Sequence, residues 1–336
     1  MYRFTKNLFC LTGLNDNEQN ICLNDYYKEK PVNRRDFLKT SLRTAGSIFI
    51  SSSVFSGRVF SAEESNAGHF DLAAVRNAEP ERLFDEAIKA LGGMSRFVKK
   101  GKTVLIKPNI GWNIEPQYAA TTNPNLLKRI ILHCKEAGAS KIYVNDHPIF
   151  DWKTCYKISG IEKAAKDAGA IIVPSGSESY YHSTTIRRAK ALKQAKLHEI
   201  FMSADTIINV PVLKHHFGSK MTCGLKNLIG TTWDMNAFHS AGLHESIADI
   251  ATVRRIDLTV VDAFCIVKRN GPRGGDFSDL LKMKSLIASP DIVAADTAAA
   301  KLFGINPEAV DHIRYAADFK LGQMDLSKLR IKRIVL

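Results

Sequence analysis

The sequence VLIKPN, at Val104–Asn109, begins the stretch that decides the fold. PNLLKRIILHCKEAG follows at Pro124–Gly138, and IYVND follows at Ile142–Asp146. The first and third segments are short apolar runs, as in buried strands, whereas the second has its apolar residues at helical spacing and ends on a glycine. Strand, helix and strand in this order predict a βαβ unit with two parallel strands.

The same alternation continues on both sides of this unit. Further strands are predicted at 70–75, 171–173, 206–210, 258–262 and 284–287, and further helices at 81–91, 161–168, 240–253 and 293–303. The pattern predicts an α/β fold with a largely parallel sheet, helices on both faces and a polar cleft at the carboxyl ends of the strands. A single domain is expected over residues 63–336, and the basic stretch near 175–200 allows an insertion there.

Residues 1–62 are predicted to be an export signal. The pair Arg34-Arg35 is followed by Phe37-Leu38-Lys39, and an uncharged, moderately apolar stretch of 14 residues runs over 44–57. That stretch is too short to span a bilayer and has the length of a signal peptide's apolar region. The segment resembles the twin-arginine (Tat) export signal with a long leader, and an amphipathic N-terminal helix is the alternative. The resemblance implies the Tat translocase as a partner during export and a periplasmic or exported location.

The basic composition does not by itself indicate nucleic-acid binding. The chain has 47 Lys+Arg and 34 Asp+Glu, for a formal net charge of +13. Nine of these bases and five of these acids lie in residues 1–62, so the remainder carries +9. Because no basic helix interleaved with aromatic residues occurs, nucleic acid is not an expected partner. No apolar run reaches the ~20 residues of a membrane-spanning helix, so no stable membrane span is expected.

The cysteines exclude two kinds of metal centre. Of the six in the chain, Cys134, Cys155, Cys223 and Cys265 lie beyond residue 62. None forms a CxxC pair, so neither a zinc ribbon nor a ferredoxin-type cysteine motif is encoded, and the cofactor stays unknown. Cys223 is expected to be a small buried residue, although a thiolate stabilised by Lys226 is the alternative.

Polar side chains follow the predicted strands, at the edge where open α/β sheets bind ligands. Lysine is a compact charge suited to phosphate or carboxylate, and a glycine loop permits close approach of the backbone. The predicted ligand-binding residues are Lys107, Asn109, Asp146, Lys214, Lys226, Asn227, Gly271 and Gly274. For Lys214 and Lys226 the alternative is a pair of ordinary solvated lysines, and for the Asn270–Gly275 loop it is a simple turn.

Histidines supply the candidate acid–base groups. His215 and His239 are the predicted catalytic residues, because an imidazole exchanges protons near neutral pH. His215 and His216 point to opposite sides if the chain is extended there, and His239 and His244 are five residues apart, which is off one helical face. A metal is therefore an open question. Asp291 is expected to cap the helix that follows it.

Several of these stretches together resemble one family, the domain of unknown function 362. The resemblance is carried by VLIKPN at 104–109, NVPVLKHH at 209–216, GLKNLIG at 224–230, VVDAF at 260–264, NGPRGG at 270–275 and SPDIVAADTAAAKLFG at 289–304. Many members of that family carry a ferredoxin-like segment and are described as iron–sulfur or redox proteins. This chain has no such segment, which weakens the redox interpretation that the resemblance implies.

Two hypotheses about function follow. The first is an exported enzyme that binds a small anionic ligand or cofactor at the strand ends, with redox chemistry favoured by the resemblance and isomerisation or racemisation next. The second is a non-catalytic periplasmic solute-binding protein. Two lobes joined by a hinge favour the second hypothesis, whereas perturbed lysine and histidine pKa values in one domain favour the first.

Overall fold

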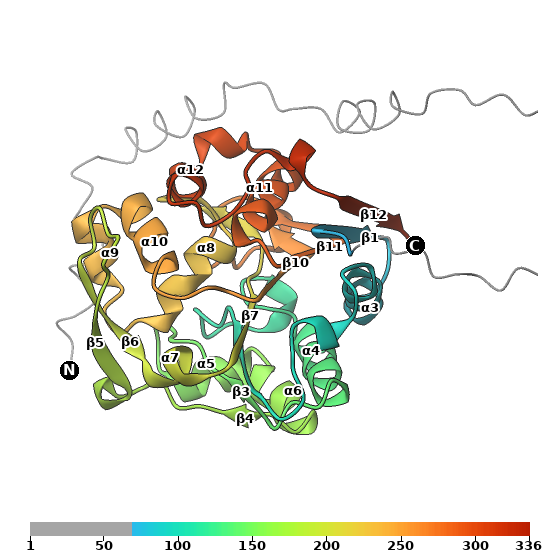
Figure 1. Ribbon diagram of the computed structural model, residues 1–336, viewed down its shortest axis with the longest axis horizontal. Helices are drawn as coiled ribbons and strands as arrows, with labels where there is room; N and C mark the ends of the chain where they lie inside the picture. The colour runs from blue at the N-terminus through green and yellow to red at the C-terminus, as the bar shows by residue number, and fades with distance from the viewer. Residues whose placement is uncertain (1–68) are drawn as a thin grey trace, which may run out of the picture. The chain divides into compact units, whose positions relative to one another are not determined.

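The computed structural model describes residues 69–336, and the predicted export signal lies outside them (Figure 1). Eight strands form one sheet in the order β12-β1-β11-β10-β7-β2-β3-β4. Their bounds are β1 Leu72–Arg76, β2 Thr103–Pro108, β3 Lys141–Val144, β4 Ile171–Ile172, β7 Thr206–Val210, β10 Leu258–Val267, β11 Leu280–Ser289 and β12 Ile331–Val335. Strand β11 is antiparallel to both of its neighbours, and the other neighbouring pairs are parallel. The predicted α/β fold with a largely parallel sheet is confirmed.

Helices cover both faces of this sheet (Figure 1). Within β2, Val104 and Ile106 belong to one hydrophobic cluster and Leu105 to the other, because successive side chains of a strand point to opposite faces. On the Val104 face pack α3 Pro80–Ala90, α4 Pro124–Glu136, α5 Trp152–Ile158 and α6 Ile161–Asp167. On the Leu105 face pack α7 Glu199–Ser203, α8 Gly224–Asn227, α9 Asn236–Ala241, α10 Leu243–Ala251, α11 Ile292–Phe303 and α12 Asp311–Asp318.

Helix ends follow the capping chemistry of the sequence. The side chain of Asn123 accepts hydrogen bonds from the backbone at the start of α4, which has a proline at its first position. Asp291 caps α11 by accepting from the Ala294 N–H at 2.9 Å, as predicted. In the described residues no helix is both long enough and apolar enough to cross a bilayer.

Three predicted elements, one helix and two strands, differ in extent from the structure. The helix expected at 240–253 is two helices, α9 and α10, because Gly242 lies between them at φ +107°. Strands β10 and β11 each have ten residues and extend beyond the predicted runs, because they pair with each other in a long antiparallel ladder. The stretch near 175–200 contains β5 Tyr181–Thr185 and β6 Gln194–His198, a two-stranded sheet of their own.

The strand order places a switch point between β2 and β7. From β2 the chain moves outward to β3 and β4 on one side, and it then returns to add β7 on the other side of β2. Connections that leave in opposite directions leave space above the carboxyl ends of the two strands, where α/β proteins bind ligands. A second hairpin, β8 Lys214–His216 with β9 Lys220–Thr222, follows β7 directly and leads into α8.

Candidate functional site

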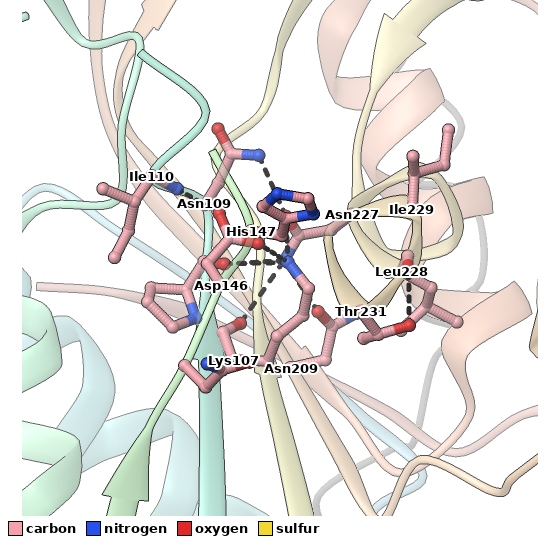
Figure 2. Close-up of polar contacts among 12 residues, drawn as sticks. Lys107, Asn109, Ile110, Asp146, His147, Asn209, Asn227, Leu228, Ile229 and Thr231 are labelled. Atoms are coloured by element: carbon pink, nitrogen blue, oxygen red, sulfur yellow. Dashed lines mark hydrogen bonds and ion pairs between the residues drawn. The ribbon is translucent and has the colours of Figure 1, made fainter. Parts of the chain in front are cut away.

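The ends of β2 and β3, with α8, bring four of the predicted ligand-binding residues together: Lys107, Asn109, Asp146 and Asn227 (Figure 2). In the parallel register Lys107 lies opposite Asn209, so β2 and β7 end at the same level. Leu105 and Lys107 point to the same face of the sheet, the face covered by α8, and there Lys107 contacts Asn227 at 3.2 Å.

The centre of this cluster is a buried ion pair. The Lys107 ammonium lies 2.5 Å from Asp146 Oδ1, and the two residues are 1% and 2% exposed. The second carboxylate oxygen of Asp146 accepts from the Ile110 N–H at 2.6 Å. Burial lowers the pKa of Lys107 and raises that of Asp146, while each partner's charge acts against this effect. Lys107, a predicted ligand-binding residue, therefore has its charge balanced inside the protein and holds the strand ends together.

One glycine makes room for the ion pair. A Cβ atom on Gly230 would lie 2.0 Å from Asp146 Oδ1 and 2.9 Å from the Lys107 ammonium nitrogen. Atoms cannot approach so closely, so any side chain here would push the carboxylate out of place.

We expect Gly230→Ala to lower the free energy of unfolding by about 1–3 kcal/mol, the usual cost of overpacking a filled interior. Urea denaturation followed by circular dichroism measures this loss. Gly111→Ala is the matched control, because a Cβ atom there would meet nothing within 4 Å. Equal stability of the two variants would contradict the steric argument.

Three asparagines connect the strand ends to α8. Asn227 Nδ2 donates to Asn209 Oδ1 at 2.8 Å, and Asn109 Nδ2 donates to Asn227 Oδ1 at 2.9 Å. Asn209 in turn donates to the Gly224 carbonyl oxygen at 2.9 Å. Asn109 and Asn227 are predicted ligand-binding residues, and the structure brings both of them beside Lys107 (Figure 2). Their amides are donors and acceptors in an internal network.

Lys214 and Lys226 differ from Lys107 because neither has a carboxylate partner. Lys214 is 2% exposed and donates to Asn109 Oδ1 at 2.8 Å and to the Ala120 carbonyl oxygen at 2.5 Å. Lys226 is partly buried, and its ammonium makes no hydrogen bond or ion pair within residues 69–336. Burial, assisted by the charge of Lys226, lowers the pKa of Lys214 to about 7, and burial lowers that of Lys226 to about 8.

The two predicted catalytic histidines lie in different places. His215 is on β8, where its Nδ1 accepts from the Gly271 N–H at 3.1 Å. Burial lowers its pKa. His239 is an exposed residue of α9, and burial followed by the charge of Lys226 lowers its pKa. Of the two predicted catalytic histidines, His239 is the one whose pKa is lowered by the charge of Lys226.

The glycine loop predicted to bind ligand lies between β10 and β11. Gly271 packs so closely on His215 that a Cβ atom would lie 2.3 Å from the His215 carbonyl oxygen. Gly274 has φ +65° and faces Val267. The loop therefore covers the His215 side of the β8–β9 hairpin.

Two further polar residues hold the backbone around this cluster. Asp296, on α11, accepts from the Gly224 and Leu225 N–H groups at 2.7 and 2.9 Å and so anchors the start of α8. Burial raises its pKa to about 6. His147 donates from Nδ1 to the Thr232 carbonyl oxygen at 2.7 Å. The position of Asp296 within α11 does not indicate which distant backbone groups its carboxylate binds. The contact with Gly224 and Leu225 is therefore visible only in the folded structure.

In the described part of the chain, no three His, Cys, Asp or Glu side chains gather in a way that could hold a metal ion. The four cysteines there are free thiols. Cys223 is fully buried, and burial raises its pKa well above the ordinary value, as expected of a small packed residue rather than a thiolate. Lys214 and Lys226 are lysines of this cluster that make no ion pair with a carboxylate in the described residues.

Fold and site together define an α/β protein with a lysine-rich cluster at the switch point of its sheet. The chain belongs to the family described as Domain of unknown function (DUF362), which matches residues 104–301, as the sequence resemblance indicated. It is 29% identical over 253 residues to "Thylakoid-associated protein sll1697" of Synechocystis sp. (strain ATCC 27184 / PCC 6803 / Kazusa), covering 70% of this chain and 73% of that protein.

The chain is also similar, at low identity, to a protein of known structure. It is the lactate racemase apoprotein from Thermoanaerobacterium thermosaccharolyticum, with a TM-score of 0.44 and 12% identity. The similarity covers 68% of this chain and 56% of that chain, so our protein spans little more than half of its length.

Proposed function

We propose that this protein is an enzyme that binds a small anionic substrate or cofactor at Lys214 and Lys226. The observation that carries the proposal is the pair of buried or partly buried ammonium groups without a carboxylate partner. Asp146, whose charge reaches Lys214, is itself paired with Lys107 at 2.5 Å. The cluster has three lysines, Lys107, Lys214 and Lys226, and one carboxylate, Asp146. Because Asp146 is paired with Lys107, the positive charges of Lys214 and Lys226 are not balanced.

An uncompensated cation in the interior is costly, and an anion reverses that cost. Burial of a charge without a partner costs several kcal/mol. Opposite charges 4 Å apart attract by about 4 kcal/mol at the effective dielectric constant near a protein surface. Asn109 Oδ1 and the Ala120 carbonyl oxygen hold the Lys214 ammonium in position but do not neutralise it. The cluster is thus complementary to a carboxylate or phosphate-like group.

The lowered lysine pKa values favour an enzyme over a non-catalytic solute-binding protein. Groups that titrate near neutral pH are typical of active sites, because they can take up or release a proton during a reaction. Lys214, with its pKa at about 7, is such a group. We further propose His215 or His239 for proton transfer, redox chemistry as the reaction class that the family resemblance favours, and Tat-dependent export as the N-terminal sequence indicates.

A panel of small anions tests the proposal. The full chain is heated with sulfate, phosphate or acetate at constant ionic strength, with chloride as the reference. Sulfate and phosphate also stabilise proteins in general because they are excluded from the surface, so Lys226→Met is heated in the same salts as a second reference. Because a ligand that binds only the folded state stabilises it by RT ln(1 + [L]/Kd), we expect at least one of the three anions to raise Tm more in the wild type than in Lys226→Met. Equal shifts in the two proteins with all three anions would contradict anion binding.

Anion binding should weaken as the pH rises. Both lysines are charged below pH 7, and they lose their protons as the pH passes about 7 for Lys214 and about 8 for Lys226. A bound anion favours the charged forms, so binding takes up protons in this window. We expect sulfate affinity, measured by isothermal titration calorimetry, to fall by at least about tenfold between pH 6 and pH 9. An unchanged affinity would show that these lysines are not the binding groups.

A further inference from the structure

The β8–β9 hairpin places one histidine on the same side as Lys214. Side chains two residues apart on a strand share a face, so His216 lies on the Lys214 face and His215 on the opposite one. His215 accordingly contacts the Gly271 loop, whereas His216 does not. His216 is 7% exposed, and the hairpin leads through Cys223 directly into the helix that carries Lys226.

The hairpin turn fixes the tautomer of His216. Its Nδ1 accepts from the Gly218 N–H at 3.1 Å and from the Ser219 N–H at 3.3 Å. A neutral imidazole carries one proton, on one of its two ring nitrogens. A nitrogen that accepts hydrogen bonds from two backbone N–H groups cannot be the one that carries this proton. The proton is therefore on Nε2, which makes no hydrogen bond within residues 69–336.

We propose that His216 is a third binding residue of the anion site, held by the β8–β9 turn as a neutral Nε2–H donor to the ligand bound at Lys214 and Lys226. The inference rests on the proposed function. It assigns to His216 a role in binding, because a nitrogen locked as a donor cannot also accept a proton. An imidazole N–H that makes no hydrogen bond within the described residues is a donor that a bound oxyanion would accept from.

The charges around His216 act in the same direction. Burial and the charges of Lys226 and Lys214 lower its pKa to about 2, and the neighbouring imidazoles of His239 and His215 add to this effect. His216 thus stays neutral through the neutral pH range, in which Lys214 and Lys226 titrate. The ligand class that fits two ammonium groups and one fixed N–H is a small oxyanion such as phosphate, sulfate or a carboxylate.

The test compares two replacements of His216 with sulfate as the probe. In His216→Asn the side-chain oxygen can still accept from the turn, in the place of Nδ1, but the Nε2 donor is lost. We expect about tenfold weaker sulfate binding with little change in Tm, as for the loss of one hydrogen bond to a charged group. In His216→Gln an amide N–H can reach the Nε2 position, so part of the affinity should return. His182→Asn, at an exposed histidine of β5, is the control and should bind as the wild type does.

A second measurement needs no substitution. In the 15N-labelled full chain, the ring pattern of His216 should show the Nε2–H tautomer from pH 5 to pH 8, and its N–H resonance should move when sulfate is added. His216→Asn binding as tightly as the wild type, or a resonance that ignores bound sulfate, would overturn the inference while leaving the proposed function intact. A wild-type protein that binds none of the anions would overturn the proposed function, and the inference with it.

Discussion

Replacing Asp146 by alanine is expected to lower the free energy of unfolding by about 3–5 kcal/mol, the cost of leaving one member of a buried ion pair without its partner. The variant leaves the Lys107 ammonium uncompensated at 1% exposure and removes the acceptor of the Ile110 N–H. Urea denaturation of the full chain measures the loss. Asp167→Ala is the control, because Lys163 and Asp167 form an exposed pair at 2.7 Å, which contributes little.

A double substitution separates the charge from the packing. Lys107→Met with Asp146→Leu removes both charges and retains apolar volume, so it should recover much of the stability that either single variant loses. The expected pattern is two strongly destabilised single variants and a milder double variant. A loss below about 1 kcal/mol in Asp146→Ala would mean that the pair does not hold the strand ends together.

Replacing Lys226 by methionine is expected to have the opposite effect on stability and a large effect on binding. Methionine keeps an apolar stem of similar length, and it removes a partly buried ammonium that has no partner in the described part of the chain. The free energy of unfolding should therefore stay the same or rise. Sulfate affinity should fall at least about tenfold, because a charge in contact with the anion is lost. A gain in stability with a loss of binding is the pattern of a residue kept for function.

The controls for this prediction use lysines of other kinds. Lys128→Met replaces an exposed lysine of α4 and should leave sulfate binding unchanged. Lys226→Arg keeps the charge and should retain part of the affinity, since arginine differs from lysine in shape and donor geometry. If Lys226→Met were less stable than the wild type and bound sulfate equally well, Lys226 would be a structural residue.

The sequence indicated where the polar residues gather but not how they pair. Lys107 lies at the carboxyl end of β2, Asp146 comes after β3 and Lys214 comes after β7, and parallel strands that end at one edge must bring such residues near one another. Asp146 neutralises Lys107 because β2 lies beside β3 in the sheet. Lys214 has only neutral acceptors because β7, which precedes it in the chain, lies on the other side of β2. Strand order is a property of the whole sheet, so residue patterns alone did not reveal which lysine stays available for a ligand.

The orientation of the histidines was also only partly predictable from the sequence. Alternation predicted that His215 and His216 point to opposite sides, which holds on β8. Which side faces the lysines could not be decided, because it is determined by the turn at Gly218 and Ser219 and by the loop around Gly271. The turn contacts are local, but the contact between Gly271 and His215 joins residues that are 56 positions apart in the chain.

The most direct test of anion binding is to titrate the Lys226 ammonium in the full chain. Lysine side-chain resonances, assigned with Lys226→Met and followed by NMR over pH 6–11, report its pKa without and with saturating sulfate. We predict a pKa of about 8 in the absence of sulfate, against the ordinary 10.5, and a clear rise when sulfate binds. A pKa near 10.5 that sulfate does not change would contradict the account.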